Sequence, residues 1–162
     1  MTHSCPPAVL FVCLGNICRS PLAEAALRHA AARAGTEVVV DSAGTGDWHV
    51  GRPPDPRAQA VAQAHGVEIG HYRARQIGHA DFTRFTHILA LDHQNLADIR
   101  MLAPASATAE LALLMDKVPG REGLPVADPY FGDEAGFLAT WAEVTLAADA
   151  LVRHLLENPA SG

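Results

Sequence analysis

Short apolar runs alternate with amphipathic segments along the chain, and this is the pattern of strands that alternate with helices. Residues 8–12 are apolar and largely β-branched or aromatic, without polar alternation, and Gly15 follows them shortly. This composition predicts a strand that is buried on both faces. Further strands are predicted at residues 36–40, at residues 87–91 and within residues 110–115.

Helices are predicted between and after these strands. The first opens with Ser20 as N-cap and Pro21 at the first helical position, and Gly35 ends it. The last carries apolar residues along one stripe at the helical period, namely Phe137, Leu138, Trp141, Val144, Ala148, Leu151, Val152 and Leu155. The predicted helices cover about residues 21–34, 56–64, 92–102 and 134–156.

Strands that alternate with helices need crossover connections, which make the strands parallel and place helices on both faces of the sheet. The predicted fold class is therefore α/β, a three-layer α/β/α arrangement around a four-stranded, parallel, doubly wound sheet. No repeat or low-complexity linker divides the chain, so residues 1–162 are expected to form one domain, with residues 1–7 as a flexible N-terminal tail. Sites in such folds lie at the carboxyl ends of the strands.

The charge of the chain excludes binding partners that are recognised through bulk positive charge. Lys and Arg number 12 and Asp and Glu number 18, which gives a net charge of −6. We therefore expect no nucleic acid and no membrane as partner, and any anion must be bound by a local group of donors. The longest unbroken apolar run is residues 8–14, and no signal peptide is recognisable. The cytoplasm is the expected compartment, with leaderless export as the alternative, and the expected state is a monomer, with a weak dimer as the alternative.

The segment from Cys13 to Ser20 combines a strand end, a tight loop and a helix start. Five residues separate Cys13 from Arg19, and a loop of that size can direct successive backbone N–H groups at one tetrahedral anion. Gly15 and Asn16 are the residues that tolerate positive φ. Arg19 would add a planar fork of donors, and the same field would favour the thiolate of Cys13. The alternative is a buried strand-end cysteine with an arginine that only reaches solvent.

Residues that could belong to a functional site also follow the other predicted strands. Residues 41–44 follow the second strand and Asp92 follows the third. Residues 116–132 contain the helix and strand breakers Pro119, Gly120, Gly123, Pro125 and Pro129. They therefore predict a long loop, and long ordered loops are often functional.

The sequence resembles the low-molecular-weight protein tyrosine phosphatases. The resemblance is carried by residues 12–21 followed by Ala23 and Glu24, and by further matches in family order up to residues 128–132. It implies that Cys13 is the nucleophile of a cysteinyl-phosphate mechanism, that Arg19 clamps the phosphate and that Asp128 is the general acid and base. The residues of the implied phosphate-binding loop are Leu14, Gly15, Asn16, Ile17, Cys18 and Ser20.

The same resemblance implies supporting roles. Ser20 would hydrogen-bond the sulfur of Cys13, and the residues that brace the loop would be Asn16, Ser42 and His71. Trp48, Tyr130 and Phe131 would line the mouth of the pocket, which suits a planar phenyl phosphate and leaves phosphoserine too short to reach the thiolate. The implied partners are proteins that carry phosphotyrosine, with a tyrosine kinase and a host protein as the alternatives that the sequence leaves open.

Two relatives of the same fold are the alternatives. Phosphoarginine phosphatases usually carry Thr in the loop where this chain has Ile17, so Ile17 points to phosphotyrosine. A thiol-dependent arsenate reductase would need further cysteines, and none follows Cys18. A non-catalytic phosphate-binding domain should have lost the nucleophile, the arginine or the acid, and this chain keeps all three.

The three cysteines, Cys5, Cys13 and Cys18, suit reduced thiols better than a disulfide framework. The resemblance suggests that Cys18 forms a disulfide with Cys13 under peroxide, and the alternative is a small buried residue at the loop edge. Nine histidines show no zinc spacing, so we expect no metal, and we expect no cofactor.

Overall fold

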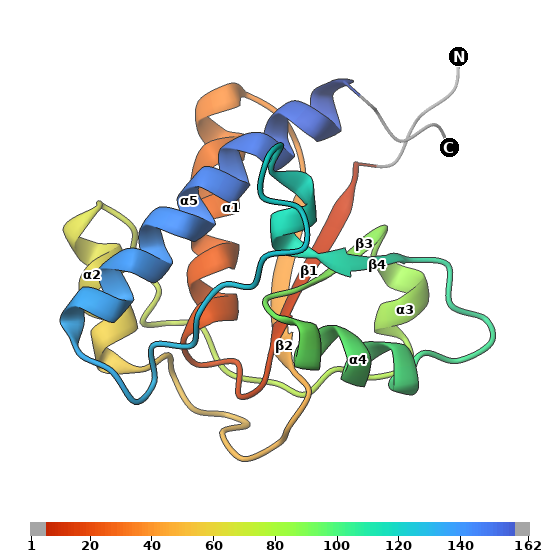
Figure 1. Cartoon of the computed structure of the whole chain (residues 1–162), viewed down its shortest axis with the longest axis horizontal. Coiled ribbons are helices and arrows are strands. Elements are labelled where there is room, and N and C mark those ends of the chain that lie inside the picture. The colour runs from red at the N-terminus through yellow and green to blue at the C-terminus, as the bar shows by residue number, and fades with distance from the viewer. Residues whose placement is uncertain (1–5, 158–162) are drawn as a thin grey trace.

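A four-stranded parallel sheet forms the centre of the molecule (Figure 1). The computed structural model describes residues 6–157. The strand order is β2-β1-β3-β4, which is the doubly wound arrangement predicted from the sequence. The strands are β1 (Ala8–Cys13), β2 (Val39–Gly44), β3 (His87–Ala90) and β4 (Glu110–Leu113).

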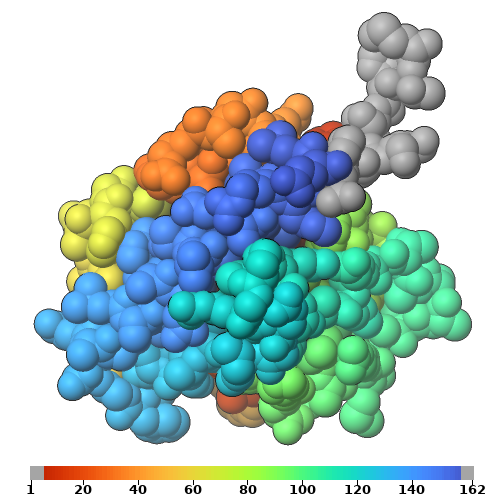
Figure 2. Space-filling view, turned by 45° about the horizontal axis from the view of Figure 1, so that its top comes forward, coloured from red at the N-terminus to blue at the C-terminus, as the bar shows by residue number. Residues whose placement is uncertain are grey.

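Helices cover both faces of this sheet and complete the three layers. Helices α1, α2 and α5 lie on one face, and α3 and α4 lie on the other (Figure 1). The space-filling view shows α1 and α5 side by side (Figure 2). The helices are α1 (Arg19–Ala34), α2 (Pro56–Ala64), α3 (Asp81–Arg84), α4 (His93–Leu102) and α5 (Glu134–Glu157), and a 3-10 turn, η1, covers Leu114–Lys117.

The central strand β1 divides the core into two clusters. Val9 and Phe11 belong to the cluster with α1 and α5, whereas Leu10 and Val12 belong to the cluster with α3 and α4. All four side chains are fully buried or nearly so. The uninterrupted apolar run of this strand is therefore explained by burial on both faces, as predicted.

The predicted position of the second strand was wrong. The strand covers Val39–Gly44 rather than residues 36–40, and it pairs with β1 from Ala8 opposite Val39 to Cys13 opposite Gly44. Its polar residues can lie in the sheet because other segments satisfy them. Ser42 donates to Glu24 and Asp41 accepts from Arg75. Residues 41–44 are thus part of the strand, and the short helix α3 was not predicted.

The predicted N-cap of α1 was also wrong. The helix begins at Arg19, with Cys18 at the cap and no side-chain cap bond, so Ser20 lies within the first turn. Its hydroxyl is engaged with the sulfur of Cys13 instead. The predicted end is confirmed, because Gly35 adopts φ of +67° and its N–H caps the last turn.

Helix α5 is the one helix within residues 6–157 that is long and apolar enough to cross a membrane. It packs along α1, and its predicted stripe is buried except for Leu138, which is exposed. The apolar character of α5 is therefore that of a core helix.

Candidate active site

Cys13 lies at the carboxyl end of β1, at the base of the phosphate loop (residues 13–20). Its side chain is buried, and its sulfur accepts the backbone N–H of Asn16 at 3.3 Å. The Ser20 hydroxyl lies 2.9 Å from the same sulfur. Asn16 takes the left-handed conformation, with φ of 59°, whereas Gly15 does not adopt the positive φ expected for it. The sulfur thus faces polar hydrogens at the start of α1, an environment that stabilises negative charge.

Asn16 connects the phosphate loop to two other segments through its side chain. Its Nδ2 donates to the hydroxyls of Ser20 at 2.8 Å and Ser42 at 2.9 Å, and its Oδ1 accepts the backbone N–H of Arg75 at 3.0 Å. All polar atoms of this amide are therefore engaged, and the left-handed turn is held by β2 and by the segment before α3.

Glu24 extends this network beyond the residues predicted for it. Its Oε1 accepts from Ser42 at 2.7 Å, and Arg28 donates to its Oε2 at 2.8 Å. Burial raises the pKa of Glu24, while the bonds from Ser42 and Arg28 oppose that shift. Glu24 was visible in the sequence only as part of the family signature, but a single carboxylate among the otherwise apolar residues 21–27 was a signal for such a role.

His71 does not join this network as expected. Its side chain is exposed and its ring packs edge-on against Tyr72, with 4.9 Å between the ring centroids. It lies in a surface groove together with Glu24 and Arg28. No hydrogen bond among residues 6–157 joins His71 to the phosphate loop, and from this segment it is the backbone N–H of Arg75 that bonds Asn16.

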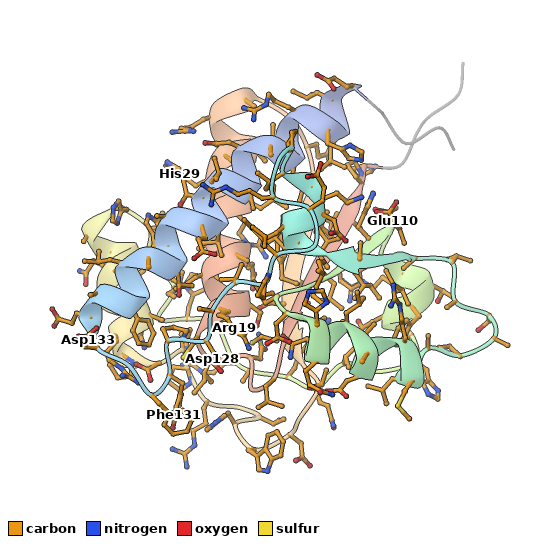
Figure 3. All side chains as sticks on the ribbon, viewed as in Figure 1. Arg19, His29, Glu110, Asp128, Phe131 and Asp133 are labelled. Carbon is orange, nitrogen blue, oxygen red and sulfur yellow. The ribbon has the colours of Figure 1, made fainter. Side chains whose placement is uncertain are left out.

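Arg19 is a buried residue of the phosphate loop and is held by two acceptors. Its Nη1 donates to the carboxylate of Asp92 at 2.7 Å and to the carbonyl of Val126 at 2.9 Å. Asp92 is the N-cap of α4, where it also accepts the N–H of Asn95. The other nitrogen, Nη2, lies 3.6 Å from Asp128. Arg19 and Asp128 come together at the carboxyl ends of the strands, with Phe131 beyond Asp128 (Figure 3).

A pocket of about 280 Å³ opens above this assembly. The predicted aromatic residues Trp48, Tyr130 and Phe131 all line it, and so do Ile17 and His49. Tyr130 and Phe131 pack edge to face, with ring centroids 4.9 Å apart. The complete lining is Cys13, Leu14, Gly15, Ile17, Cys18, Arg19, Trp48, His49, Asp128, Tyr130 and Phe131. The thiol, the arginine and the carboxylate therefore face one apolar-walled space that is wide enough for an aromatic ring.

Comparison with known proteins decides the family. A model of the family described as low molecular weight phosphotyrosine protein phosphatase matches residues 8–160. The chain belongs to this family. It is an α/β phosphoric monoester hydrolase, and the resemblance found in the sequence is confirmed.

Known members of the family and their solved structures match this chain over most of both lengths. The low molecular weight phosphotyrosine protein phosphatase of Schizosaccharomyces pombe is 43% identical over 132 residues, which cover 80% of this chain and 84% of that protein. The crystal structure of YfkJ from Bacillus subtilis matches with a TM-score of 0.89 and 34% identity, covering 98% of this chain and 99% of that chain. The structure of DARP, described as a drosophila arginine phosphatase, matches with a TM-score of 0.85 and 34% identity over 90% of this chain and 96% of that chain.

The acid loop of the phosphatase (residues 126–133) carries Asp128 on the surface side of the pocket. The Asp128 carboxylate accepts the N–H of Tyr130 at 3.0 Å. Arg57, at the start of α2, donates to the carbonyls of Tyr130 at 2.9 Å and Gly132 at 3.0 Å. Arg57 also forms an ion pair with Asp55, whose backbone N–H donates to the carbonyl of Ile17. This connection between the two loops was not recognised from the sequence.

Cys18 is buried at the edge of the pocket and, like Cys13, is a free thiol. Burial, together with the charge of Asp55, raises the pKa of the Cys18 thiol well above its usual range. Cys5 lies outside the described residues, as does most of the predicted N-terminal tail. No group of three His, Cys, Asp or Glu side chains within residues 6–157 is arranged to hold a metal ion.

Proposed function

We propose that the phosphatase hydrolyses phosphotyrosine in proteins by a two-step displacement at Cys13. In the first step, the Cys13 thiolate attacks phosphorus, the bond from phosphorus to the phenolic oxygen breaks, and Asp128 donates its proton to that oxygen. In the second step, the Asp128 carboxylate takes a proton from water, the water oxygen attacks phosphorus, and the P–S bond breaks. The assembly of Cys13, Arg19 and Asp128 around one pocket carries this proposal.

Charge stabilisation in both steps falls to the phosphate loop. Its backbone N–H groups and the fork of Arg19 are fixed before substrate arrives, because Asn16, Asp92 and the carbonyl of Val126 already hold them. Ser20 would stabilise the thiolate as it leaves in the second step. Preorganised donors supply most of the catalysis of phosphoryl transfer, since the transition state is loose and spreads its charge over the equatorial oxygens.

The pocket walls favour phosphotyrosine over phosphoarginine. Ile17 presents an apolar side chain to the pocket, and Trp48 and Tyr130 offer aromatic faces. A phenyl ring gains from such walls, whereas a guanidinium would have to give up water there for few acceptors. Phosphoarginine is the second candidate substrate, because DARP is a structural relative described as an arginine phosphatase.

The proposed partners are phosphotyrosine proteins, including a tyrosine kinase, and the proposed site of action is the cytoplasm. The net charge of −6 and the free thiols of Cys13 and Cys18 are consistent with this assignment. The chain is proposed to be one domain that acts as a monomer, and sedimentation across a range of concentrations would distinguish a monomer from a weak dimer.

Reversible oxidation is proposed for the same site. Peroxide would oxidise the Cys13 thiolate to a sulfenic acid, and the Cys18 thiol would then attack that sulfur, forming a disulfide and releasing water. The proximity of both side chains to one pocket supports this step. Mass spectrometry of peroxide-treated protein should find a disulfide between Cys13 and Cys18. Finding Cys13 overoxidised and not crosslinked would contradict the proposed disulfide.

One set of assays tests the proposed reaction. Matched peptides carrying phosphotyrosine, phosphoserine or phosphoarginine are offered to the wild type, to Cys13→Ser and to Asp128→Ala, in the presence of a metal chelator. We expect selective hydrolysis of phosphotyrosine, none by Cys13→Ser, and a loss of about 10²–10⁴-fold in kcat for Asp128→Ala. Turnover by Cys13→Ser or an undiminished rate for Asp128→Ala would contradict the assigned roles. Equal or faster cleavage of phosphoarginine would contradict the assigned substrate.

A further inference from the structure

A second hollow lies directly beside the catalytic pocket. It has a volume of about 310 Å³ and shares two wall residues, Leu14 and Trp48, with that pocket. The rest of its lining comes from the loop after β2 and from α4, namely Thr45, Gly46, Asp98, Met101 and Leu102. We call this hollow the side groove. A substrate that fills the catalytic pocket and continues past Trp48 or Leu14 enters it without leaving the surface.

The side groove exposes large apolar side chains that the fold does not bury. Met101 is 87% exposed and Trp48 is 69% exposed, and Leu14 and Leu102 are each more than 40% exposed. Adjoining exposed apolar residues on a soluble protein commonly mark a ligand-binding surface. Methionine suits such a surface because its flexible, polarisable side chain adapts to different apolar partners.

Trp48 separates the catalytic pocket from the side groove, and its indole lies on the backbone of Gly46. A Cβ atom on Gly46 would clash with the indole of Trp48, so the indole rests against Gly46 in this arrangement. The N–H of Gly46 in turn donates to the carbonyl of Leu14 at 2.9 Å. The backbone beneath the indole is therefore bonded to the phosphate loop.

We propose that the side groove binds a large apolar side chain of the substrate protein, close in sequence to the phosphotyrosine. This inference rests on the proposed function, which places the phosphotyrosine ring in the adjoining pocket. A substrate segment in extended conformation advances about 3.3 Å per residue and directs alternate side chains to the same side, so a residue near the phosphotyrosine can enter the groove.

The negative charge of the side groove limits which substrate side chains it can bind. The Asp98 carboxylate lines the groove and accepts from Gln94 on the same helix, and the whole chain carries a net charge of −6. An acidic side chain would lose hydration there and meet a carboxylate of like charge. The groove therefore selects leucine or methionine and disfavours glutamate at the same peptide position.

The experiment scans phosphotyrosine peptides in which each position flanking the phosphotyrosine is in turn Ser, Leu or Glu. We expect Leu at one position to raise kcat/KM about tenfold over Ser, as the burial of one aliphatic side chain allows, and Glu there to lower it. Met101→Ser and Leu102→Ser should each reduce this preference for Leu to about threefold or less, because each removes part of the apolar surface. Hydrolysis of p-nitrophenyl phosphate, which does not reach the groove, should stay unchanged in both variants.

Leu138→Ser is the matched control, since Leu138 is also an exposed apolar helical residue but lies on α5. It should leave the preference intact. The inference is overturned if Leu raises kcat/KM at no position, if Glu serves as well as Leu, or if the preference survives in both groove variants. A wild type that hydrolyses neither p-nitrophenyl phosphate nor the Ser peptides would instead refute the proposed function, so the two failures are distinguishable.

Discussion

The phosphate loop and the acid loop face each other across the same pocket, yet they are held in opposite ways. Cys13, Asn16 and Arg19 are each no more than 5% exposed, and buried polar partners engage them. On the other side, Tyr130 is 37% and Phe131 is 97% exposed. The phosphate-binding half of the site is therefore part of the core, whereas most of the acid loop lies at the surface.

Each loop is supported by an arginine–carboxylate pair, Arg28 with Glu24 for the phosphate loop and Arg57 with Asp55 for the acid loop. The first pair has the more deeply buried carboxylate. Glu24 is buried, and burial raises its pKa despite the bond from Arg28. Asp55 is more accessible, and the bonds from Arg57 lower its pKa. Burial dominates behind the phosphate loop, whereas the ion pair dominates behind the acid loop. We infer that the cradle for the phosphoryl group is preformed, while the acid depends on a hydrogen-bonded attachment at the surface.

The largest effect is expected from Arg19→Lys, which alters the buried half. A lysine keeps the charge but cannot contact Asp92, the carbonyl of Val126 and the phosphoryl oxygens through one planar fork. We expect kcat/KM for p-nitrophenyl phosphate to fall about 10³-fold, as for the loss of an arginine that stabilises a phosphoryl transition state. A fall of less than tenfold would show that the fork geometry is unimportant.

Ser42→Ala should affect stability as well as activity. The substitution leaves Oε1 of Glu24 and one N–H of Asn16 without their partner in a buried network. We expect the free energy of unfolding, measured with urea, to fall by about 1–3 kcal/mol, and kcat/KM to fall with it. Thr83→Ala removes a hydroxyl that bonds a carbonyl at an exposed site, and it should change stability much less. Equal effects of the two substitutions would remove the distinction between core and surface.

Arg57→Ala should release the acid loop and leave the phosphate loop in place. The carbonyls of Tyr130 and Gly132 lose their donor, so Asp128 is positioned less well. We expect kcat/KM to fall about tenfold for aryl phosphates with poorly acidic phenols and little for p-nitrophenyl phosphate, because only the former need the proton from Asp128.

The matched control for Arg57→Ala is Arg73→Ala. Arg73 also donates to two backbone carbonyls, those of Gly70 and Tyr72, but neither belongs to the acid loop. Its loss should leave all aryl phosphates unaffected. If Arg57→Ala slows every substrate equally, its role is general stability and not the positioning of Asp128.

The smallest expected effect is a difference between the two loops in how their stability responds to acid. Because the folded-state pKa of Asp55 is lowered, its contribution to stability is present above the ordinary value of 3.8 and is lost as pH falls through the folded value. Glu24 has the opposite sign, since its raised pKa costs stability as pH rises above 4.5. The protection factor, which corrects for the slower intrinsic amide exchange at lower pH, should therefore fall at Tyr130 before it falls at Asn16 as the solution is acidified, and the reverse order would contradict this assignment.

The elements that local sequence determines were predictable, and those that depend on distant partners were not. The strand, loop and helix around Cys13 follow from a continuous apolar run, a tight turn and Pro21. The second strand was misplaced because the polar residues Asp41 and Ser42 can lie in β2 only with partners from elsewhere in the chain.

The same distinction applies to the site. The residues that touch the pocket could be named from the family signature, and Trp48, Tyr130 and Phe131 line it as expected. Arg57 holds the acid loop through the backbone carbonyls of Tyr130 and Gly132. Every residue has a backbone carbonyl, so this contact could not be predicted from the types of side chain. His71, which was expected to help brace the loop, is exposed, and from its segment it is the backbone N–H of Arg75 that bonds Asn16.

Quench-flow measurement on Asp128→Ala tests the separation of the two halves most directly. With p-nitrophenyl phosphate, whose leaving group needs little protonation, the intact phosphate loop should still transfer the phosphoryl group to Cys13. We predict a burst of about one p-nitrophenol per enzyme, followed by slow turnover, with the trapped phosphoryl group on Cys13 by mass spectrometry, because the missing carboxylate no longer activates water. Turnover without a burst, or a phosphoryl group on another residue, would contradict the account.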